Sequence, residues 1–494
     1  MDLNIKVLLI SCTCPEPSTP SLGITSIASY LLGKNISVKV FDDAPYMVDI
    51  VDEKTDPREM ILSVQKTNPS DLYRLPFAER FNDLIAMIRD FNPNIVGAST
   101  TEATYNNAIE YFDLIKVNFP LIKTVIGGAF AIIAPDIAIL HNSVDMVAIG
   151  EGELAIEEYC NCLEANRDPL NTKGLWIKKD GKIVKNGAAQ LIDIDNIPPL
   201  RFDLYQEKRL YRPISGAVRR MLPLEVSRGC MYNCTFCASP VFSQQLRLGG
   251  KWLRNKSIEK IEEDIIAYKK YFDPQYFFII SETFLGATDD YLDEFTAMYC
   301  KYKIPFWMNT RPETITEEKI KKLKAVGLER MSVGVECGNE KYRSEFLNRK
   351  YTNEHLEKVF TILQSYDIKV TANVMIGLPD ETREMIFDSI RLIKVLKPAS
   401  VGLAVFQPYK GTKMYEYVVN KNYYNSGTII NSTCYKPNFY NPNLATEEIM
   451  KLLYTFNLYV KTDEKKWSVI DAIDISNEIG MLSLKRLLNE FSAS

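Results

Sequence analysis

The chain has 494 residues, of which 46% are hydrophobic and 25% charged, so it has the composition of a globular protein and is neither disordered nor collagen-like. Its 59 Lys and Arg against 63 Asp and Glu give a formal net charge of −4, and the sequence has no basic block that would indicate nucleic-acid binding. No apolar run reaches the roughly 20 residues that span a bilayer, so we expect no membrane span and a cytoplasmic protein.

The first part of the chain alternates short β-branched runs with longer amphipathic segments. Segments such as residues 104–116 carry apolar residues at helical spacing. Five strands joined by such crossovers predict a doubly wound, Rossmann-like parallel sheet, in which ligands bind beyond the carboxyl ends of the strands. The strands are expected at residues 6–10, 37–41, 94–99, 124–127 and 144–149.

After this sheet the pattern changes. A hairpin is expected around Asp180-Gly181, and Pro198-Pro199 reads as a stiff connector. We therefore expect a linker with a β-hairpin at residues 156–215, which separates two larger units. The predicted division is 1–155 for the first sheet, 156–215 for the linker, 216–418 for a second α/β unit and 419–494 for a mainly helical end.

The second unit again alternates strands and helices, with a longer period. A helix is expected at residues 316–326, from an N-cap Thr316 to Gly327. Six such βα units predict a partial (β/α)6 barrel of the TIM type, with its active site at the carboxyl ends of the strands. The strands are expected at residues 223–227, 276–281, 305–309, 330–336, 369–376 and 400–406. Further helices are expected at 446–460 and 479–491.

Cys230, Cys234 and Cys237 directly follow the first strand of the predicted barrel. Three thiolates at this spacing can bind three corners of a cubane [4Fe–4S] cluster and leave the fourth iron without a protein ligand. A structural zinc site would need four ligands, and the loop holds no fourth Cys or His. The open iron favours a catalyst, because a substrate or cofactor can bind there.

With the aromatic Phe236 before the last cysteine, the motif resembles the radical S-adenosylmethionine (SAM) superfamily. The resemblance implies that the open iron binds the amino and carboxylate groups of SAM, and that the reduced cluster cleaves SAM to a 5′-deoxyadenosyl radical. It extends to strand-end residues that would bind SAM, where structural roles stay open as alternatives: Phe236, Glu282, Arg311, Glu336, Asn373 and Gly377. Among these, Glu336 is expected at the ribose hydroxyls, and Arg311 is a candidate clamp for a carboxylate.

The first unit resembles the cobalamin-binding domain of the cobalamin-dependent radical SAM enzymes, through segments 20–31, 92–99, 125–128 and 149–153. The resemblance implies that cobalamin binds at the strand-end loops. These residues are Ser99, Thr100, Thr101, Gly127, Gly128, Ala129, Phe130, Gly150 and Glu151. For Phe130 two positions stay open, one against the corrin face and one in the core. The loops are small, hydroxylated or glycine-rich, so a large ligand can approach the backbone.

Two absences limit the mechanism. Neither His141 nor His355 lies in an Asp-x-His-x-x-Gly motif, so cobalt ligation by histidine through that motif is excluded. Radical SAM methylthiotransferases bind a second cluster through three cysteines of their amino-terminal domain. This chain has only Cys12 and Cys14 near the sheet edge. The sequence therefore disfavours a methylthiotransferase.

The resemblance implies a C-methyltransferase that methylates an unactivated sp3 carbon through the 5′-deoxyadenosyl radical and methylcobalamin. An oxidative cyclase or ring-rearranging enzyme with the same cofactors stays open, as does a non-catalytic cobalamin or iron–sulfur binding protein. The substrate is expected to be a small molecule, a lipid, or a peptide or protein. A flavodoxin or ferredoxin is expected as the electron donor, and the protein is expected to be a monomer.

Overall fold

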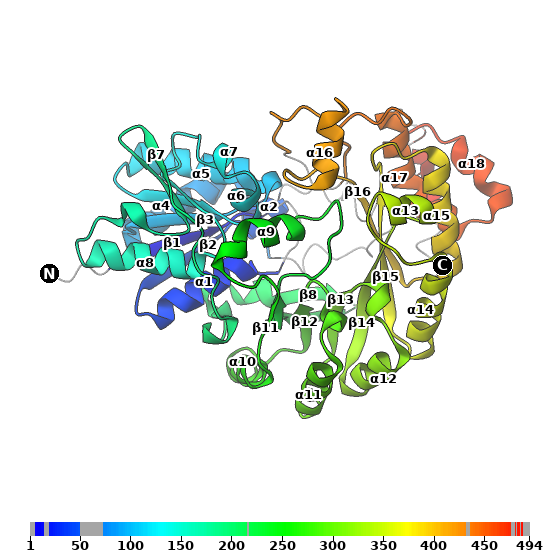
Figure 1. Cartoon of the computed structure of the whole chain (residues 1–494), viewed down its shortest axis with the longest axis horizontal. Coiled ribbons are helices and arrows are strands. Elements are labelled where there is room, and N and C mark those ends of the chain that lie inside the picture. Colours follow the sequence, from blue (N-terminus) through cyan, green and yellow to red (C-terminus); the bar gives the residue numbers. More distant parts are fainter. Residues whose placement is uncertain are drawn as a thin grey trace.

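The structure is a computed structural model that describes residues 5–13, 19–49, 73–214, 217–430, 435–475, 480, 482–484 and 486–487. Cys14 and Cys434 lie outside these residues. Figure 1 shows two sheets with their helices, the first on the left in blue to teal and the second on the right in green to yellow. Helix α9 (Ser239–Leu246) lies between them. Within the described residues, no helix is long and apolar enough to cross a membrane.

The first sheet has the strand order β2-β1-β3-β4-β5-β6-β7. Its first five strands are parallel, which confirms the doubly wound sheet. They are β1 (Lys6–Ser11), β2 (Ser37–Asp42), β3 (Ile95–Ser99), β4 (Lys123–Gly127) and β5 (Met146–Ala148). The helices around this sheet are α1 (Leu22–Gly33), α2 (Ala44–Asp49), α4 (Arg80–Phe91), α5 (Tyr105–Asn118), α6 (Ala129–Ile133), α7 (Pro135–Ala138) and α8 (Gly152–Glu164).

Helices cover both faces of this sheet because successive side chains of each strand point to opposite sides. Val7 and Leu9 of β1 pack in one cluster with residues of α1 and α8. Leu8 and Ile10 pack in a second cluster with residues of α4 and α5. The central residues of β1 are therefore apolar in an unbroken run, as in other parallel strands that are buried on both faces.

The hairpin that the sequence assigns to the linker belongs to the first sheet. Strand β6 (Leu175–Lys179) pairs antiparallel with β5, and β7 (Lys182–Lys185) pairs antiparallel with β6. Asp180 and Gly181 both have positive φ, 49° and 74°, which suits the tight turn that joins two twisted antiparallel strands. The hairpin covers the edge that β5 would otherwise expose.

The second sheet has the order β16-β15-β14-β13-β12-β9-β8. Six strands are parallel and curl into the expected partial barrel, and β8 (Tyr211–Ile214) is antiparallel to β9. The parallel strands are β9 (Ala217–Glu225), β12 (Tyr276–Ile280), β13 (Phe306–Thr310), β14 (Leu328–Glu336), β15 (Lys369–Ile376) and β16 (Ser400–Val405). The helices that follow strands are α10 (Ile258–Tyr271), α11 (Asp289–Tyr299), α12 (Glu317–Val326), α13 (Glu340–Glu345), α14 (Asn353–Ser365) and α15 (Arg383–Leu396).

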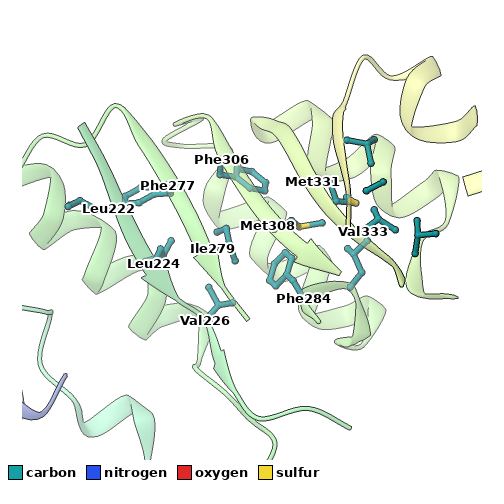
Figure 2. Packing of buried hydrophobic residues seen from close by; sticks show 14 of the residues in the cluster. Leu222, Leu224, Val226, Phe277, Ile279, Phe284, Phe306, Met308, Met331 and Val333 are labelled. Atoms are coloured by element: carbon teal, nitrogen blue, oxygen red, sulfur yellow. The ribbon is translucent and has the colours of Figure 1, made fainter. Parts of the chain in front are cut away.

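The two faces of the second sheet differ in burial. Side chains on its outer face, such as Leu224, Phe277, Ile279 and Met308, are fully buried among the helices, and Figure 2 shows them packed across neighbouring strands. Alternate residues such as Phe278 point to the inner face and are only partly buried. The inner face therefore leaves space for a ligand, while the outer face supplies the stabilising hydrophobic core.

The carboxyl-terminal part combines helices with turns and irregular chain, the latter at residues 421–430 and 435–445. It contains α16 (Lys413–Asn420), α17 (Thr446–Lys461) and α18 (Trp467–Asp471). Ile449, Leu452 and Phe456 of α17 are buried in the core cluster that α15 also joins. The helix expected at 479–491 falls largely outside the described residues.

Candidate active site

A cavity of about 510 Å³ lies between the carboxyl ends of the two sheets. The first unit contributes the ends of β3, β4 and β5 and the first half of α1, and the second contributes the ends of β9, β12 and β13 with the adjoining loops. The lining from the first unit includes Gly97, Ala98, Ser99, Gly127, Gly128, Gly150 and Glu151, and the lining from the second includes Ser227, Arg228, Gly229, Phe278, Ile280, Ser281, Glu282 and Asn309. Each sheet thus presents to the other the edge at which α/β sheets bind ligands.

The wall from the first sheet depends on glycine. Gly128 has φ 89° and ψ −171°, a conformation that is essentially restricted to glycine. A Cβ there would lie 2.6 Å from the backbone N and O of Thr100. Thr100 in turn donates its N–H to Gly127 O and accepts the N–H of Phe130, which locks the two loops together. The close approach of backbone to cavity fits a large, flat ligand.

The expected cobalamin residues fall into two groups. Ser99, Gly127, Gly128, Gly150 and Glu151 line the cavity, whereas Thr100, Thr101, Ala129 and Phe130 do not appear in its lining. Thr101 caps a short turn through Thr104. Phe130 is fully buried, with its ring centroid 4.9 Å from that of Tyr105. Of the two positions left open for Phe130, the structure shows the core.

The three cysteines lie in the loop between β10 (Ser227–Arg228) and α9. Cys230, Cys234 and Cys237 are free thiols, and Cys234 is buried. The loop begins at Gly229, which has φ 91° and where a Cβ would lie 2.5 Å from Trp252 O. Burial raises the pKa of Cys230, and it raises that of Cys237 to about 11. A thiol that coordinates a metal is nevertheless deprotonated, so iron binding would release these protons, and neighbouring cations would balance the thiolate charge.

Arg311 is one such cation. Its Nη1 donates to Cys234 Sγ at 2.9 Å, and its guanidinium carbon lies 3.8 Å from the ring centroid of Tyr232. The Nε and Nη2 atoms are bound to Glu313. The sequence suggests a clamp for a carboxylate, but here this guanidinium contacts a cluster thiol and an internal carboxylate. Hydrogen bonds to the sulfur atoms of the ligands change the reduction potential of a bound cluster.

A second buried arginine near the cluster loop was not singled out from the sequence. Arg349 Nη2 lies 2.9 Å from Oε1 of Glu336, and its guanidinium carbon is 5.5 Å from the ring centroid of Phe236. Among the described residues, its Nε and Nη1 have no hydrogen-bond partner although both are buried. Unpartnered buried donors are costly, so they fit an acceptor from a bound molecule such as the SAM carboxylate. The segment Asn348-Arg349-Lys350 carries no motif that could have identified this residue.

The remaining expected SAM residues lie at the strand ends. Glu336 has φ 65° at the end of β14 and is 8% exposed, and a Cβ at Gly334 would meet its Oε1 at 2.3 Å. Asn373 is half-buried on β15, and Gly377 has φ 69° just after that strand. Glu282 lines the cavity and accepts a hydrogen bond from the N–H of Gly229.

Histidine does not take part in the cavity that the described residues form. His141 Nδ1 lies 2.8 Å from Ser143 Oγ, and His355 Nε2 lies 3.2 Å from Pro312 O. Neither lines the cavity. In the described part of the chain, no group of three or more His, Cys, Asp or Glu is placed to hold a single metal ion. In a cubane each thiolate binds a different iron, so the cysteine loop fits a cluster and not a single-ion site.

Comparisons with known proteins agree with this arrangement. Residues 9–159 match the family model of the B12 binding domain, and residues 224–393 match that of the radical SAM superfamily. An uncharacterised methyltransferase of Pyrococcus horikoshii is 26% identical over 381 residues, covering 76% of this chain and 80% of the relative. The anaerobic magnesium-protoporphyrin IX monomethyl ester cyclase of Rubrivivax gelatinosus is 23% identical over 343 residues, covering 68% of this chain and 60% of the relative.

The fold is also shared with a solved structure. The cobalamin-dependent SAM radical enzyme OxsB, solved with aqua-cobalamin and SAM bound, superposes with a TM-score of 0.68 at 16% identity. The match covers 99% of this chain and 71% of OxsB. The two matched domains, in this order and with their strand ends facing one cavity, place the chain among the cobalamin-dependent radical SAM enzymes.

Proposed function

We propose that this protein is a cobalamin-dependent radical SAM C-methyltransferase that methylates an unactivated sp3 carbon. The observation that carries the proposal is the cavity that the glycine-rich edge of the first sheet shares with Ser227, Arg228 and Gly229, the residues that lead into the cysteine loop. One of the relatives named above is a methyltransferase, and it aligns with 76% of this chain. The shared cavity would allow both cofactors to act on one substrate carbon.

The chemistry itself comes from the cofactors: the cluster with SAM supplies a 5′-deoxyadenosyl radical, and cobalamin supplies a transferable methyl group. The chain holds and orients them. Cys230, Cys234 and Cys237 would bind the cluster, and the two unpartnered N–H groups of Arg349 would bind the SAM carboxylate. Glu336, paired with Arg349, would accept hydrogen bonds from the ribose hydroxyls.

The cavity wall would keep water away from the radical. Apolar side chains from both units line it, including Ile24, Ile27, Trp252, Phe278 and Ile280. On the barrel side, the ring of Phe278 stacks on that of Trp307, with centroids 4.4 Å apart. A substrate carbon held against these rings would face both cofactor sites, which makes the reaction effectively intramolecular.

A second candidate function keeps both cofactors without methyl transfer. The relative from Rubrivivax gelatinosus is a cyclase, and it aligns with 68% of this chain. An oxidative cyclase or ring-rearranging enzyme would use the same cysteine loop and the same cavity. The product separates the two functions, because methyl transfer adds one carbon and oxidative cyclisation removes two hydrogens.

The proposal includes the setting of the enzyme. A low-potential cluster needs an electron donor of the flavodoxin or ferredoxin type, and we propose a monomeric cytoplasmic protein that works under reducing conditions. We propose a small molecule, a lipid, or a peptide or protein side chain as the substrate.

The test uses anaerobically reconstituted enzyme, a chemical reductant and SAM whose methyl group carries deuterium. The enzyme is incubated with a metabolite extract, and masses are compared with a reaction lacking reductant. A product heavier than a substrate by one deuterated methyl group supports methyl transfer. A product lighter by two hydrogens, with 5′-deoxyadenosine formed, overturns methyl transfer in favour of the cyclase.

A further inference from the structure

Arg228, which lines the cavity, connects the two units. Its Nε donates to Oε1 of Glu225 at 2.8 Å, within the second unit. Its Nη2 donates to Ser26 Oγ of α1 at 2.8 Å. Its Nη1 lies 3.0 Å from Glu153 Oε1 and 3.2 Å from Glu151 Oε1, both at the start of α8. One guanidinium group therefore reaches a strand end of the barrel and two helices of the first unit.

These groups are removed from solvent. The side chains of Glu153 and Glu225 are 3% exposed, that of Glu151 12% and that of Arg228 16%. Burial alone would lower the pKa of Arg228, but the three carboxylates outweigh it and hold the guanidinium charged. Buried ion pairs of this kind are favourable only in a narrow geometry, so they fix orientation more than they add stability.

Arg254 completes the arrangement. It lies opposite Arg228 in the antiparallel pair of β10 with β11 (Arg254–Asn255). Its Nη1 donates to Glu151 Oε2 at 3.0 Å, and its Nη2 also contacts Glu151. The backbone N–H of Ile192 donates to the same Oε2 at 3.0 Å. Both oxygens of Glu151 are thus occupied, and its carboxylate ties the first unit to β10 and β11, while the residue also lines the cavity.

The position of Arg228 gives these contacts a consequence for the cofactors. Arg228 stands two residues before Cys230, separated from it by the constrained Gly229. Its partners Glu151 and Glu153 lie where the loop that follows β5 passes into α8, and both line the cavity beside Gly150. A displacement of one loop must therefore move the other, because the link between them is short and buried.

We propose that Arg228 is a positioning residue that fixes the cysteine loop against the β5–α8 loop, and so sets how the cluster and the cobalamin lie relative to each other. The inference rests on the proposed function in that both cofactors must occupy this cavity. An arginine suits the role because its planar fork reaches several acceptors at once, whereas a lysine ammonium is a single point of charge.

The test compares the spin–spin interaction between the reduced cluster and cob(II)alamin in holoenzyme, measured by pulsed electron paramagnetic resonance. In R228K we expect wild-type iron and cobalt contents. The spin–spin coupling should be weaker, or its distribution broader, by roughly a factor of two or more, because one ammonium cannot replace the arginine fork. E153Q removes one of the facing charges and keeps the side-chain shape, so a smaller change of the same kind is expected. R201K is the matched control, because Arg201 pairs with Asp203 at the surface with its side chain 50% exposed.

The outcomes are distinct. An unchanged spin–spin interaction in both R228K and E153Q overturns the proposal. It is also overturned if both variants lose iron and cobalt to the same extent, because the network would then be purely structural. If R228K fails to fold, E153Q with full cofactor content and an altered interaction still supports it. A wild-type protein that holds iron but retains no cobalt refutes the proposed function itself, before any variant is compared.

Discussion

Replacing Gly128 with alanine tests the backbone wall of the cavity. The glycine has φ 89° and ψ −171°, where any residue with a Cβ pays roughly 1–3 kcal/mol. The new Cβ would also lie 2.6 Å from the backbone of Thr100, and relieving such overpacking costs about 1–3 kcal/mol. Together, G128A should lose about 2–6 kcal/mol of unfolding free energy in the first unit.

For a unit of this size, each kcal/mol shifts the melting temperature by roughly 2–4 °C, so a fall of roughly 4–24 °C is expected. The movement of Thr100 should also disturb the adjoining loops and weaken cobalamin binding by about tenfold, equivalent to about 1.4 kcal/mol. Thermal unfolding of the apo-protein and titration with hydroxocobalamin, followed by absorbance, measure the two effects.

The matched control is G187A. An added Cβ at Gly187 meets no atom within 4 Å, and this glycine does not have a positive φ. G187A should have the melting temperature and the cobalamin affinity of the wild type. If G128A also behaves like the wild type in both assays, the argument that the loop between β4 and α6 forms a rigid wall of the cofactor site is wrong.

Three further predictions address other parts of the site. C234A should abolish iron binding but keep cobalamin binding, because the cysteine loop and the first sheet belong to different units; iron and cobalt analysis decides, and retained iron would count against the cluster loop. R349Q should weaken SAM binding to the cluster-loaded enzyme by roughly ten- to a hundredfold, which corresponds to the loss of a charged hydrogen bond. The control K350Q, at the exposed neighbouring residue, should bind SAM like the wild type. Equal SAM affinities of R349Q and the wild type in a calorimetric titration would contradict this. Glu381 is fully buried, and burial raises its pKa from 4.5 to about 8, so the folded state loses stability as pH rises between these values. The stability of E381Q should therefore rise relative to that of the wild type over this range. Melting temperatures of the two proteins that change with pH in the same way from pH 5 to 8 would refute this prediction.

Much of the fold follows from local patterns. The five strands of the first sheet and five of the six barrel strands lie close to their predicted positions, because buried parallel strands are apolar runs with clear ends, whereas β9 begins at Ala217, before the predicted start at residue 223. The cysteine loop is recognised from spacing alone. The Asp-Gly turn predicts the hairpin. It does not predict that the hairpin joins the first sheet, because its pairing with β5 is a tertiary contact that no local pattern encodes.

The site is less predictable because its decisive contacts join distant residues. Arg228 and Glu151 are 77 positions apart, and only the packing of the two units brings them together. Phe130 follows the glycine pair in a loop expected to bind cofactor, yet its aromatic ring fills the core against Tyr105. Arg349 is one basic residue in a polar segment, and its role depends on burial that the sequence does not reveal.

The most direct test of the central claim is the metal content of the wild-type protein after anaerobic reconstitution with iron, sulfide and hydroxocobalamin, followed by desalting. If both cofactors share the cavity between the two sheets, the chain should hold about four irons and one cobalt, with absorption from both the cluster and the corrin. Four irons without retained cobalt would contradict the account and leave a radical SAM enzyme that works without cobalamin.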